Sequence, residues 1–314
     1  MFAFEERNQL TQGLTLIYHH FTSFGLEIHV GKGKKDSKTE CVFFPPPGFF
    51  VRRFNLPAKN SRVNSRMLVP KTRQESQKAR NIREEIAYNG LPKTRLIVVK
   101  DGFVTFCQHL NYLGPWISFS LREDHDIVKR IASANALMGA LSKIWDDDHV
   151  DTYSKYLLFR SIPCNLLLWG CNIWTLRKSL LASLEVFLHM GIRIILKVKM
   201  CQVFEQRITN TSMRENLYNI PTIKNQIVLC RLTYLGKIFR QEDSHIPTCL
   251  LTVWSDHPCK VGRPILTNKQ CILINIQRVI PDVDVYGSVS TWVFHALDTQ
   301  HWNDVLKTLK HPSF

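Results

Sequence analysis

Acidic side chains and a histidine gather in the middle of the chain, where Asp146, Asp147 and Asp148 are followed by His149 and Asp151. Such a cluster could hold a divalent cation, as enzymes that use two metal ions on nucleic acids require. The cluster also falls between two helical patterns, and aspartate is a residue that caps helices and forms turns. We therefore expect a loop between helices here and no metal site.

A second set of possible metal ligands comprises His245, Cys249, His257 and Cys259. Their spacing, H-x3-C-x7-H-x-C, lacks the closely spaced cysteine pair of structural zinc sites. Hydrolase chemistry has no support, because the chain contains no Gly-rich phosphate loop, no G-x-S-x-G and no H-E-x-x-H sequence. We expect no cofactor to be bound by this chain.

Positive charge is the strongest feature of the composition. The chain has 41 Lys and Arg against 26 Asp and Glu, a formal charge of +15 at pH 7. Between Arg52 and Lys100 there are thirteen Lys or Arg against three Glu. This excess predicts sequence-tolerant, salt-sensitive binding to nucleic acid, although a solvated basic loop without a dedicated partner would look the same. The residues that we assign to binding are Arg52, Arg53, Arg62, Arg66, Lys71 and Arg73.

The cellular compartment can also be predicted. Nine cysteines are scattered without paired spacing, and the N-terminus shows no secretory signal. No run of about twenty apolar residues is present, so we expect no membrane association. These features predict reduced thiols and an intracellular protein, in the nucleus or the cytoplasm.

The elements that must position these groups form an α+β pattern. The apolar pattern of the N-terminal part predicts a helix over 8–24 that ends at Gly25 and lies between short strands. Such a unit leaves strand edges unpaired unless further strands complete its sheet. The strands we expect are 1–4, 26–30, 39–44, 95–99, 102–107 and 110–113. The later helices we expect are 73–88, 126–145, 152–168, 180–197, one from Met213, 222–240, 268–279 and 301–309.

Several short stretches then follow one another along the chain. They are FGLEI and SKTE at 24–28 and 37–40, LNYLG at 110–114, LWGCNIWTL at 168–176, LTYLGKIFR at 232–240 and GRP at 262–264. In this order they resemble the GLxIN…KT element, the F-x-Y-L-G hairpin and the LxYGxExWTL, LRWLGHxxR and GRP signatures of LINE-type (non-LTR) retrotransposon reverse transcriptases. The chain departs from that pattern at Trp169, where tyrosine is common, and at Ile173, where a polar residue is common.

The resemblance implies roles for individual residues. Lys38 matches a lysine proposed to donate a proton to the leaving pyrophosphate, and the alternative is an ordinary exposed turn residue. Asn111, Tyr112 and Gly114 match a hairpin that grips the primer end. The alternative is a plain hairpin in which Tyr112 and Leu113 pack on the following helix. Trp174 is expected to anchor one helix to another rather than to stack on a base.

The resemblance also implies an architecture and a function. We expect an incomplete palm with a βαββ unit (1–51), a basic insert (52–101), a primer-grip-like hairpin (102–122), a helical thumb (123–243) and a mostly helical C-terminal extension of unknown role (244–314). In the family, two aspartate-held Mg²⁺ ions support nucleotide transfer, and the catalytic Tyr-x-Asp-Asp motif would lie just upstream of Met1.

We therefore expect a fragment of an RNA-directed DNA polymerase that is inactive by itself. Its partners would be RNA and DNA, with no small-molecule substrate. Two alternatives stay open, a host-adopted RNA- or DNA-binding relic and a decaying open reading frame without function.

Overall fold

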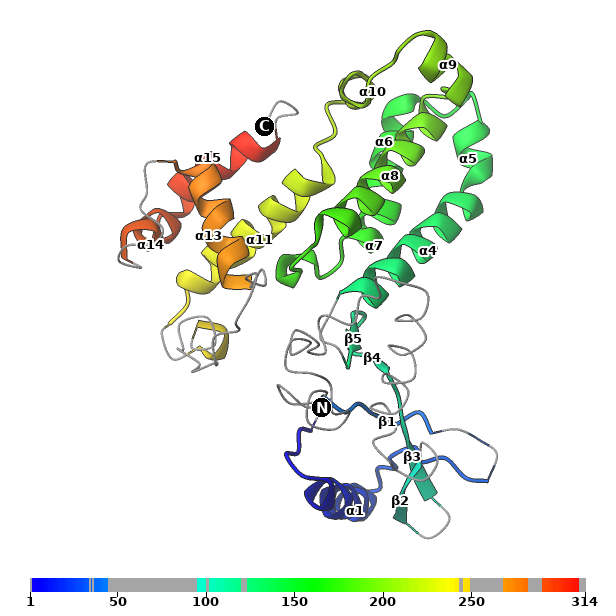
Figure 1. Cartoon of the computed structure of the whole chain (residues 1–314), viewed down its shortest axis with the longest axis vertical. Coiled ribbons are helices and arrows are strands. Elements are labelled where there is room, and N and C mark those ends of the chain that lie inside the picture. Colours follow the sequence, from blue (N-terminus) through cyan, green and yellow to red (C-terminus); the bar gives the residue numbers. More distant parts are fainter. Residues whose placement is uncertain are drawn as a thin grey trace, which may run out of the picture. The chain divides into compact units, whose positions relative to one another are not determined.

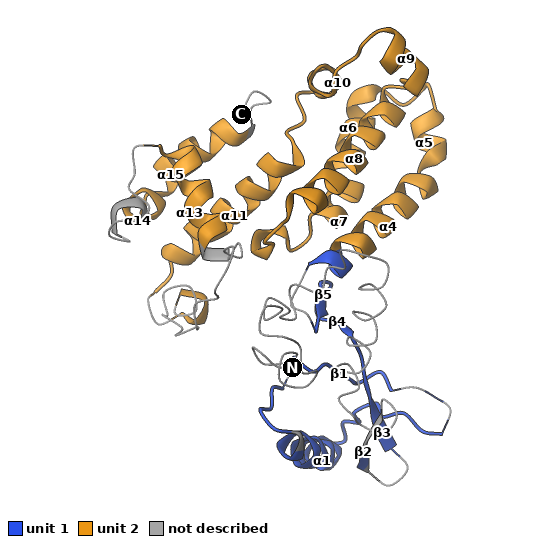
Figure 2. Cartoon of the chain, viewed as in Figure 1, with its two compact units in different colours: residues 1–126 blue, residues 127–314 orange. Residues whose placement is uncertain are grey.

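The computed structural model describes residues 2–33, 35, 37–44, 95–99, 102–119, 123–242, 245–248, 268–281 and 290–310. These residues form an α+β protein that is mostly helical and contains two small sheets (Figure 1). The α+β fold class expected from the sequence is thereby confirmed. The chain divides into two compact units, Met1–Asp126 and Ile127–Phe314 (Figure 2).

The first unit begins with helix α1 (Arg7–Ser23), which confirms the helix expected over 8–24. Gly25 ends it with φ +74°, in the left-handed region that glycine adopts without steric cost. The Gly25 N–H donates to the Thr22 carbonyl at 3.0 Å, and the Leu26 N–H donates to the Phe21 carbonyl at 2.9 Å. This pair of bonds is a Schellman motif, which satisfies carbonyls that the helix end would otherwise leave unpaired.

A three-stranded sheet follows, with strand order β1-β3-β2. Strand β1 (Glu40–Cys41) is parallel to β3 (Gly102–Phe106), and β2 (Arg95–Val99) is antiparallel to β3. The strands expected at 95–99 and 102–107 are confirmed, and the strand expected over 39–44 shrinks to two residues. Strands from much later in the sequence therefore supply pairing that the N-terminal segment lacks by itself.

Two expected strands are wrong. Residues 2–4 form no strand, because Phe4 packs on α1 instead, where a Cβ added to Gly13 would lie 2.4 Å from the Phe4 ring. Residues 26–30 also form no strand. Pairing at this point is limited to an isolated antiparallel bridge between Gly31 and Phe103, with hydrogen bonds of 2.8 and 3.0 Å.

The second sheet is a hairpin of β4 (His109–Asn111) and β5 (Trp116–Ser118). It shortens the strand expected over 110–113, because residues 112–115 form the turn rather than continuing the strand.

Helices make up the second unit, and α4 enters it from the first. In chain order the helices are α4 (Asp124–Ala140), α5 (Ser142–Asp146), α6 (Thr152–Phe159), the π-helical turn η3 (Arg160–Cys164), α7 (Asn165–Leu167), the 3-10 turn η4 (Cys171–Ile173), α8 (Lys178–Ile195), α9 (Met200–Glu205), α10 (Asn210–Asn216), α11 (Ile223–Phe239), α13 (Asn268–Val279), α14 (Ser290–Leu297), α15 (Thr299–Lys307) and the 3-10 turn η5 (Thr308–Lys310).

The helix expected over 73–88 lies outside the described residues. Most of the other expected helices agree with the structure, with exceptions that have a physical cause. The helix expected over 126–145 breaks at Leu141 into α4 and α5. The helix expected over 152–168 runs through η3, where Pro163 lacks the N–H that a regular helical bond needs. Helices α9 and α14 were not expected from the sequence.

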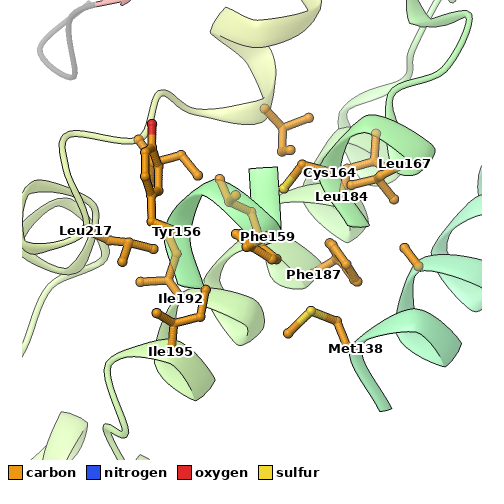
Figure 3. Packing of buried hydrophobic residues seen from close by; sticks show 14 of the residues in the cluster. Met138, Tyr156, Phe159, Cys164, Leu167, Leu184, Phe187, Ile192, Ile195 and Leu217 are labelled. Atoms are coloured by element: carbon orange, nitrogen blue, oxygen red, sulfur yellow. The ribbon is translucent and has the colours of Figure 1, made fainter. Parts of the chain in front are cut away.

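The larger hydrophobic core joins α4, α6 and α8. Figure 3 shows Phe159, Phe187 and Met138 converging from these three helices. The rings of Phe159 and Phe187 are stacked with centroids 6.3 Å apart. Gly191 makes room for this packing, because a Cβ there would lie 2.4 Å from the Phe159 ring. Burial of side chains of this size contributes about 1.5–3 kcal/mol each.

A second core shares helix α11 with the first. Ile223 and Ile227, near the start of α11, belong to the larger core, whereas Leu232 and Leu235 pack with α13 and α15. The Trp302 indole lies at the centre of this second cluster and donates from Nε1 to the Leu232 carbonyl at 3.0 Å. The described part of the C-terminal extension is therefore packed on α11.

Candidate nucleic-acid interface

Lys38 lies in a turn that is held by its neighbours. Its backbone N–H donates to His29 Nδ1 at 3.0 Å, and the Ser37 and Thr39 hydroxyls both donate to the His29 carbonyl, at 3.1 and 2.7 Å. The side chain of Lys38 is exposed. This geometry agrees with a turn residue, and the proton-donor role remains an expectation from the resemblance.

The tip of the β4–β5 hairpin presents two side chains to solvent. Tyr112 is 39% exposed and Leu113 is 80% exposed, so the alternative in which Leu113 packs on the following helix does not hold. The Asn111 side-chain oxygen accepts from the Gly114 N–H at 3.3 Å, and the Tyr112 N–H donates to the Pro115 carbonyl at 2.9 Å. Asn111 and Gly114 therefore build the turn, and the Tyr112 and Leu113 side chains form its outer surface.

The base of the hairpin is fixed to the beginning of α4. The imidazole rings of His109 and His125 stack with centroids 3.6 Å apart and planes 1° from parallel. The Asp126 carboxylate accepts from the Trp116 N–H at 3.1 Å. These contacts fix the base of the hairpin against the first turn of α4.

The loop around Trp174 is a packing centre rather than a ligand surface. Trp174 is 2% exposed, which confirms the expectation that it is part of the core. The guanidinium of Arg231 on α11 donates to the carbonyls of Asn172 and Trp174. On α4, the Arg130 guanidinium lies 5.9 Å from the centre of the Trp174 ring. Burial lowers the pKa of Arg231, yet an arginine stays charged at neutral pH.

Asp146 ends α5, and the rest of the aspartate cluster forms the loop before α6, as expected. Lys155 Nζ donates to the carbonyls of Trp145 and Asp147 at 2.9 and 2.6 Å, and Lys197 Nζ contacts Asp148. Asp151 caps α6 by accepting from the Ser154 N–H at 2.9 Å.

A cation does not fit this loop, because two ammonium groups already lie on its oxygens. The Lys197 ammonium holds the pKa of Asp148 below its usual range. Among the described residues, no three His, Cys, Asp or Glu side chains gather as metal ligands would. The Mg²⁺ ions that the resemblance implies for an intact polymerase therefore have no site in the described part of this chain.

Other residues singled out from the sequence lie outside the described residues. Of the zinc candidate, only His245 is described. None of the six residues assigned to phosphate binding is described, namely Arg52, Arg53, Arg62, Arg66, Lys71 and Arg73.

A second basic segment escaped the sequence analysis and is fully described. Residues 160–240 contain twelve Lys or Arg against three Glu, an excess of nine positive charges. Most of these cations are exposed, on α8–α11 and their connections. They are spread among apolar core residues, which hides them from a search for compact basic runs. A running count of charge over a longer window would have found them.

Polar groups inside the helical unit form one unusual cluster. Arg214 is 7% exposed, and its Nε and Nη1 atoms are buried without a hydrogen-bond partner. Glu185 and His189, one turn apart on α8, also have a buried atom without a partner. Burial, then the charges of Arg214 and Arg193, lowers the pKa of His189. A bridging water would satisfy such groups.

One cleft in the helical unit has a volume of 340 Å³ and lies between α4, α5 and α8. Its lining includes the apolar side chains of Met138, Trp145 and Met190, and Asp146 is the titratable group among its lining residues. A single carboxylate without a partner acid, base or nucleophile gives this cleft no catalytic constellation.

Comparisons of this chain with known proteins found no relative. No protein-family model, no curated protein and no solved structure matches the chain. The described helices include none with the length and apolarity that a bilayer crossing requires.

Proposed function

We propose that this chain is part of a LINE-type retrotransposon reverse transcriptase and that, by itself, it binds RNA and DNA without sequence preference. The observation that carries the proposal is the excess of nine positive charges on residues 160–240, a segment that folds as successive helices. Polymerisation is not part of the proposal for this chain, because its sequence contains no Tyr-x-Asp-Asp.

Electrostatics explains why such a surface binds nucleic acid. Each Lys or Arg that neutralises a phosphate releases condensed counterions, so affinity is high at low salt and falls steeply as salt is added. Phosphates are identical at every nucleotide, so this term carries no sequence information. The six residues that the sequence analysis assigns to binding, Arg52, Arg53, Arg62, Arg66, Lys71 and Arg73, would add to the same term.

The order of elements along the chain is compatible with the proposal. A small sheet with α1, the β4–β5 hairpin and then a set of helices follow one another along the chain. The sequence motifs resemble those at the end of a palm, in a primer-gripping hairpin and in a thumb, in that same order. Under this proposal, the exposed Tyr112 and Leu113 side chains face a primer end, and Lys38 acts only where a complete active site surrounds it.

Binding assays with the full chain test the proposal. Labelled single-stranded RNA, single-stranded DNA and an RNA–DNA hybrid are titrated, each in two unrelated sequences. We expect all six to bind with similar Kd and to weaken by at least tenfold between about 50 and about 200 mM salt. A chain that binds none of them at low salt contradicts the proposal. Template-dependent nucleotide incorporation above that of a heat-inactivated sample contradicts its non-catalytic part.

A decaying reading frame without function is the competing interpretation. The two buried cores that share α11 are relevant to this interpretation, because a domain with such cores unfolds cooperatively. We expect a sigmoidal thermal transition of the purified chain, measured by far-UV circular dichroism. A broad transition without a baseline favours the decaying reading frame.

A further inference from the structure

Three tyrosines from two parts of the helical unit meet at its surface. Tyr153 and Tyr156 lie on α6, and Tyr218 follows α10. The Tyr218 ring lies 5.1 Å from the Tyr153 ring at 71°, and 5.2 Å from the Tyr156 ring at 39°. Tyr218 therefore contacts both other rings, and the Tyr153 and Tyr218 rings meet edge to face.

The members of this cluster differ in burial. Tyr156 is 7% exposed, and its ring belongs to the larger core, with the hydroxyl directed away from the neighbouring apolar side chains (Figure 3). Tyr153 and Tyr218 are 50% and 47% exposed. The cluster is thus a platform with a buried foundation and two aromatic rings that remain accessible to a ligand.

The backbone at Tyr218 has a conformation that is unfavourable for a residue with a side chain. Tyr218 and Asn219 have φ of +52° and +54°, in the left-handed region. This is the position after a helix that usually carries glycine, because a side chain there crowds the backbone. The buried residues Leu217 and Ile220 flank the pair and fix the turn. Other helices in this chain also end with a side-chain-bearing residue at this position, so the turn sets the place of the Tyr218 ring without itself indicating a ligand.

Charge beside the platform favours an anionic polymer. The exposed Arg160 donates from Nη1 to the Tyr156 hydroxyl at 3.4 Å, which places a guanidinium beside the rings. Arg160 is also the first cation of the basic segment 160–240. Flat aromatic faces beside cations are the combination that single-stranded nucleic acids use, with bases on the rings and phosphates on the charges.

From this arrangement we infer that Tyr153 and Tyr218 form a stacking site for an unpaired nucleobase of single-stranded RNA or DNA, with Arg160 beside it for the adjoining phosphate. This inference rests on the proposed function and adds a location and a mode of contact to it. Because every base has an aromatic face, such a site tolerates any sequence. It adds affinity that depends on bases and not on phosphates.

Removal of the ring, or removal of the bases, tests the inference in the full chain. Tyr218→Gly deletes the ring and suits the left-handed backbone, so the fold is kept, which a thermal melt verifies. Tyr218→Phe keeps the ring. Tyr234→Ala removes a tyrosine that is similarly exposed on α11 and lies outside the cluster, and it serves as the matched control. Each protein is titrated with a fluorescent oligothymidylate of about 12 nucleotides and with its abasic counterpart.

We expect the wild type to bind the oligothymidylate about tenfold more tightly than the abasic strand. Tyr218→Gly should lose most of this preference, whereas Tyr218→Phe and Tyr234→Ala should retain it. A Tyr218→Gly variant with the full preference overturns the inference. So does a wild type that binds both strands equally and with steep salt dependence, and that result leaves the proposed function standing. A wild type that binds neither strand overturns both.

Discussion

At the scale of single residues, one buried side chain can stabilise the contact between two segments that lie far apart in the sequence. Arg231 is buried, and its guanidinium donates to two carbonyls of the loop around Trp174. Removing a charged donor from buried acceptors leaves those acceptors without water or protein partners. Arg231 thereby joins α11 to a segment 57 residues earlier in the chain.

Arg231→Met should therefore lower the free energy of unfolding by about 2–4 kcal/mol. Lys237→Met, on the exposed side of the same helix, is the control and should change it by less than about 0.5 kcal/mol. Denaturant titration with circular dichroism measures both. Equal stability of the two variants would show that the Arg231 hydrogen bonds contribute little.

Two thiols give a second prediction at this scale. Cys171 is buried, whereas Cys230 on α11 is exposed. A hydrogen bond from the Cys171 thiol lowers the pKa of Cys230 to about 7, against burial, which acts in the opposite direction. The same hydrogen bond, together with burial, raises the pKa of Cys171. Of the two thiols, the accessible Cys230 therefore loses its proton first.

Alkylation of Cys230 by iodoacetamide should consequently reach half of its maximal rate near pH 7, because the thiolate is the reactive form. In Cys171→Ala the hydrogen bond is lost, and the midpoint should move toward the ordinary value of about 8.5. Peptide mass spectrometry after brief labelling gives both midpoints. Identical midpoints would refute the thiol pair.

At the scale of elements, a glycine on one helix can permit the close approach of another helix. A Cβ on Gly236 of α11 would lie 2.5 Å from Nε1 of Trp302. The Trp302 ring is buried, and its Nε1 donates to the Leu232 carbonyl, so it has little freedom to move. Gly139 of α4 is the contrast, because a Cβ there would have no atom within 4 Å.

Gly236→Ala should accordingly destabilise the protein by about 1–3 kcal/mol through overpacking of α11 against α15. Gly139→Ala should stabilise it by about 0.5–1 kcal/mol, since alanine favours the helix. Thermal melts of the two variants test the difference in sign. A stabilising Gly236→Ala would mean that α15 does not pack on α11 as described.

Helices and strands also differ in how well they could be predicted from the sequence. Helices with a strong apolar period, such as α8, were predictable because their pattern is local. Strand pairing was not, since Glu40 pairs with Thr105 and no local signal records that partner. Short helices such as α9 lack enough turns for periodicity to show.

The same distinction between local and distant signals applies to the site. The burial of Trp174 follows from its size and apolarity, and it was expected. The tyrosine platform was not, because it joins α6 to the turn after α10 and depends on a left-handed backbone at Tyr218. Contacts between segments that are distant in the sequence produce no residue spacing from which they could be predicted.

For the molecule as a whole, stability should depend on pH through His189. Burial, then the charges of Arg214 and Arg193, lowers its pKa in the folded state, and a backbone hydrogen bond with Glu185 opposes them only in part. A group whose pKa is depressed by folding contributes stability above its unfolded pKa of about 6.5, and this contribution is lost as pH falls through the folded pKa.

The melting temperature of the wild type should therefore fall further than that of His189→Gln between about pH 7.5 and about pH 5.5. The exposed His149→Gln variant is the control and should follow the wild type. Equal decreases in all three proteins would show that His189 is not the group responsible.

The central claim is that phosphate contacts by the basic helical segment 160–240 drive nucleic-acid binding. The slope of log Kd against log salt for single-stranded RNA measures those contacts directly in the full chain. Lys178→Gln and Arg207→Gln remove exposed cations within the segment, and Lys307→Gln removes one outside it that already pairs with Asp304. We expect each of the first two to reduce the slope by about 0.7 and the third to leave it unchanged. A wild-type slope near zero, or equal slopes in all four proteins, would contradict the claim.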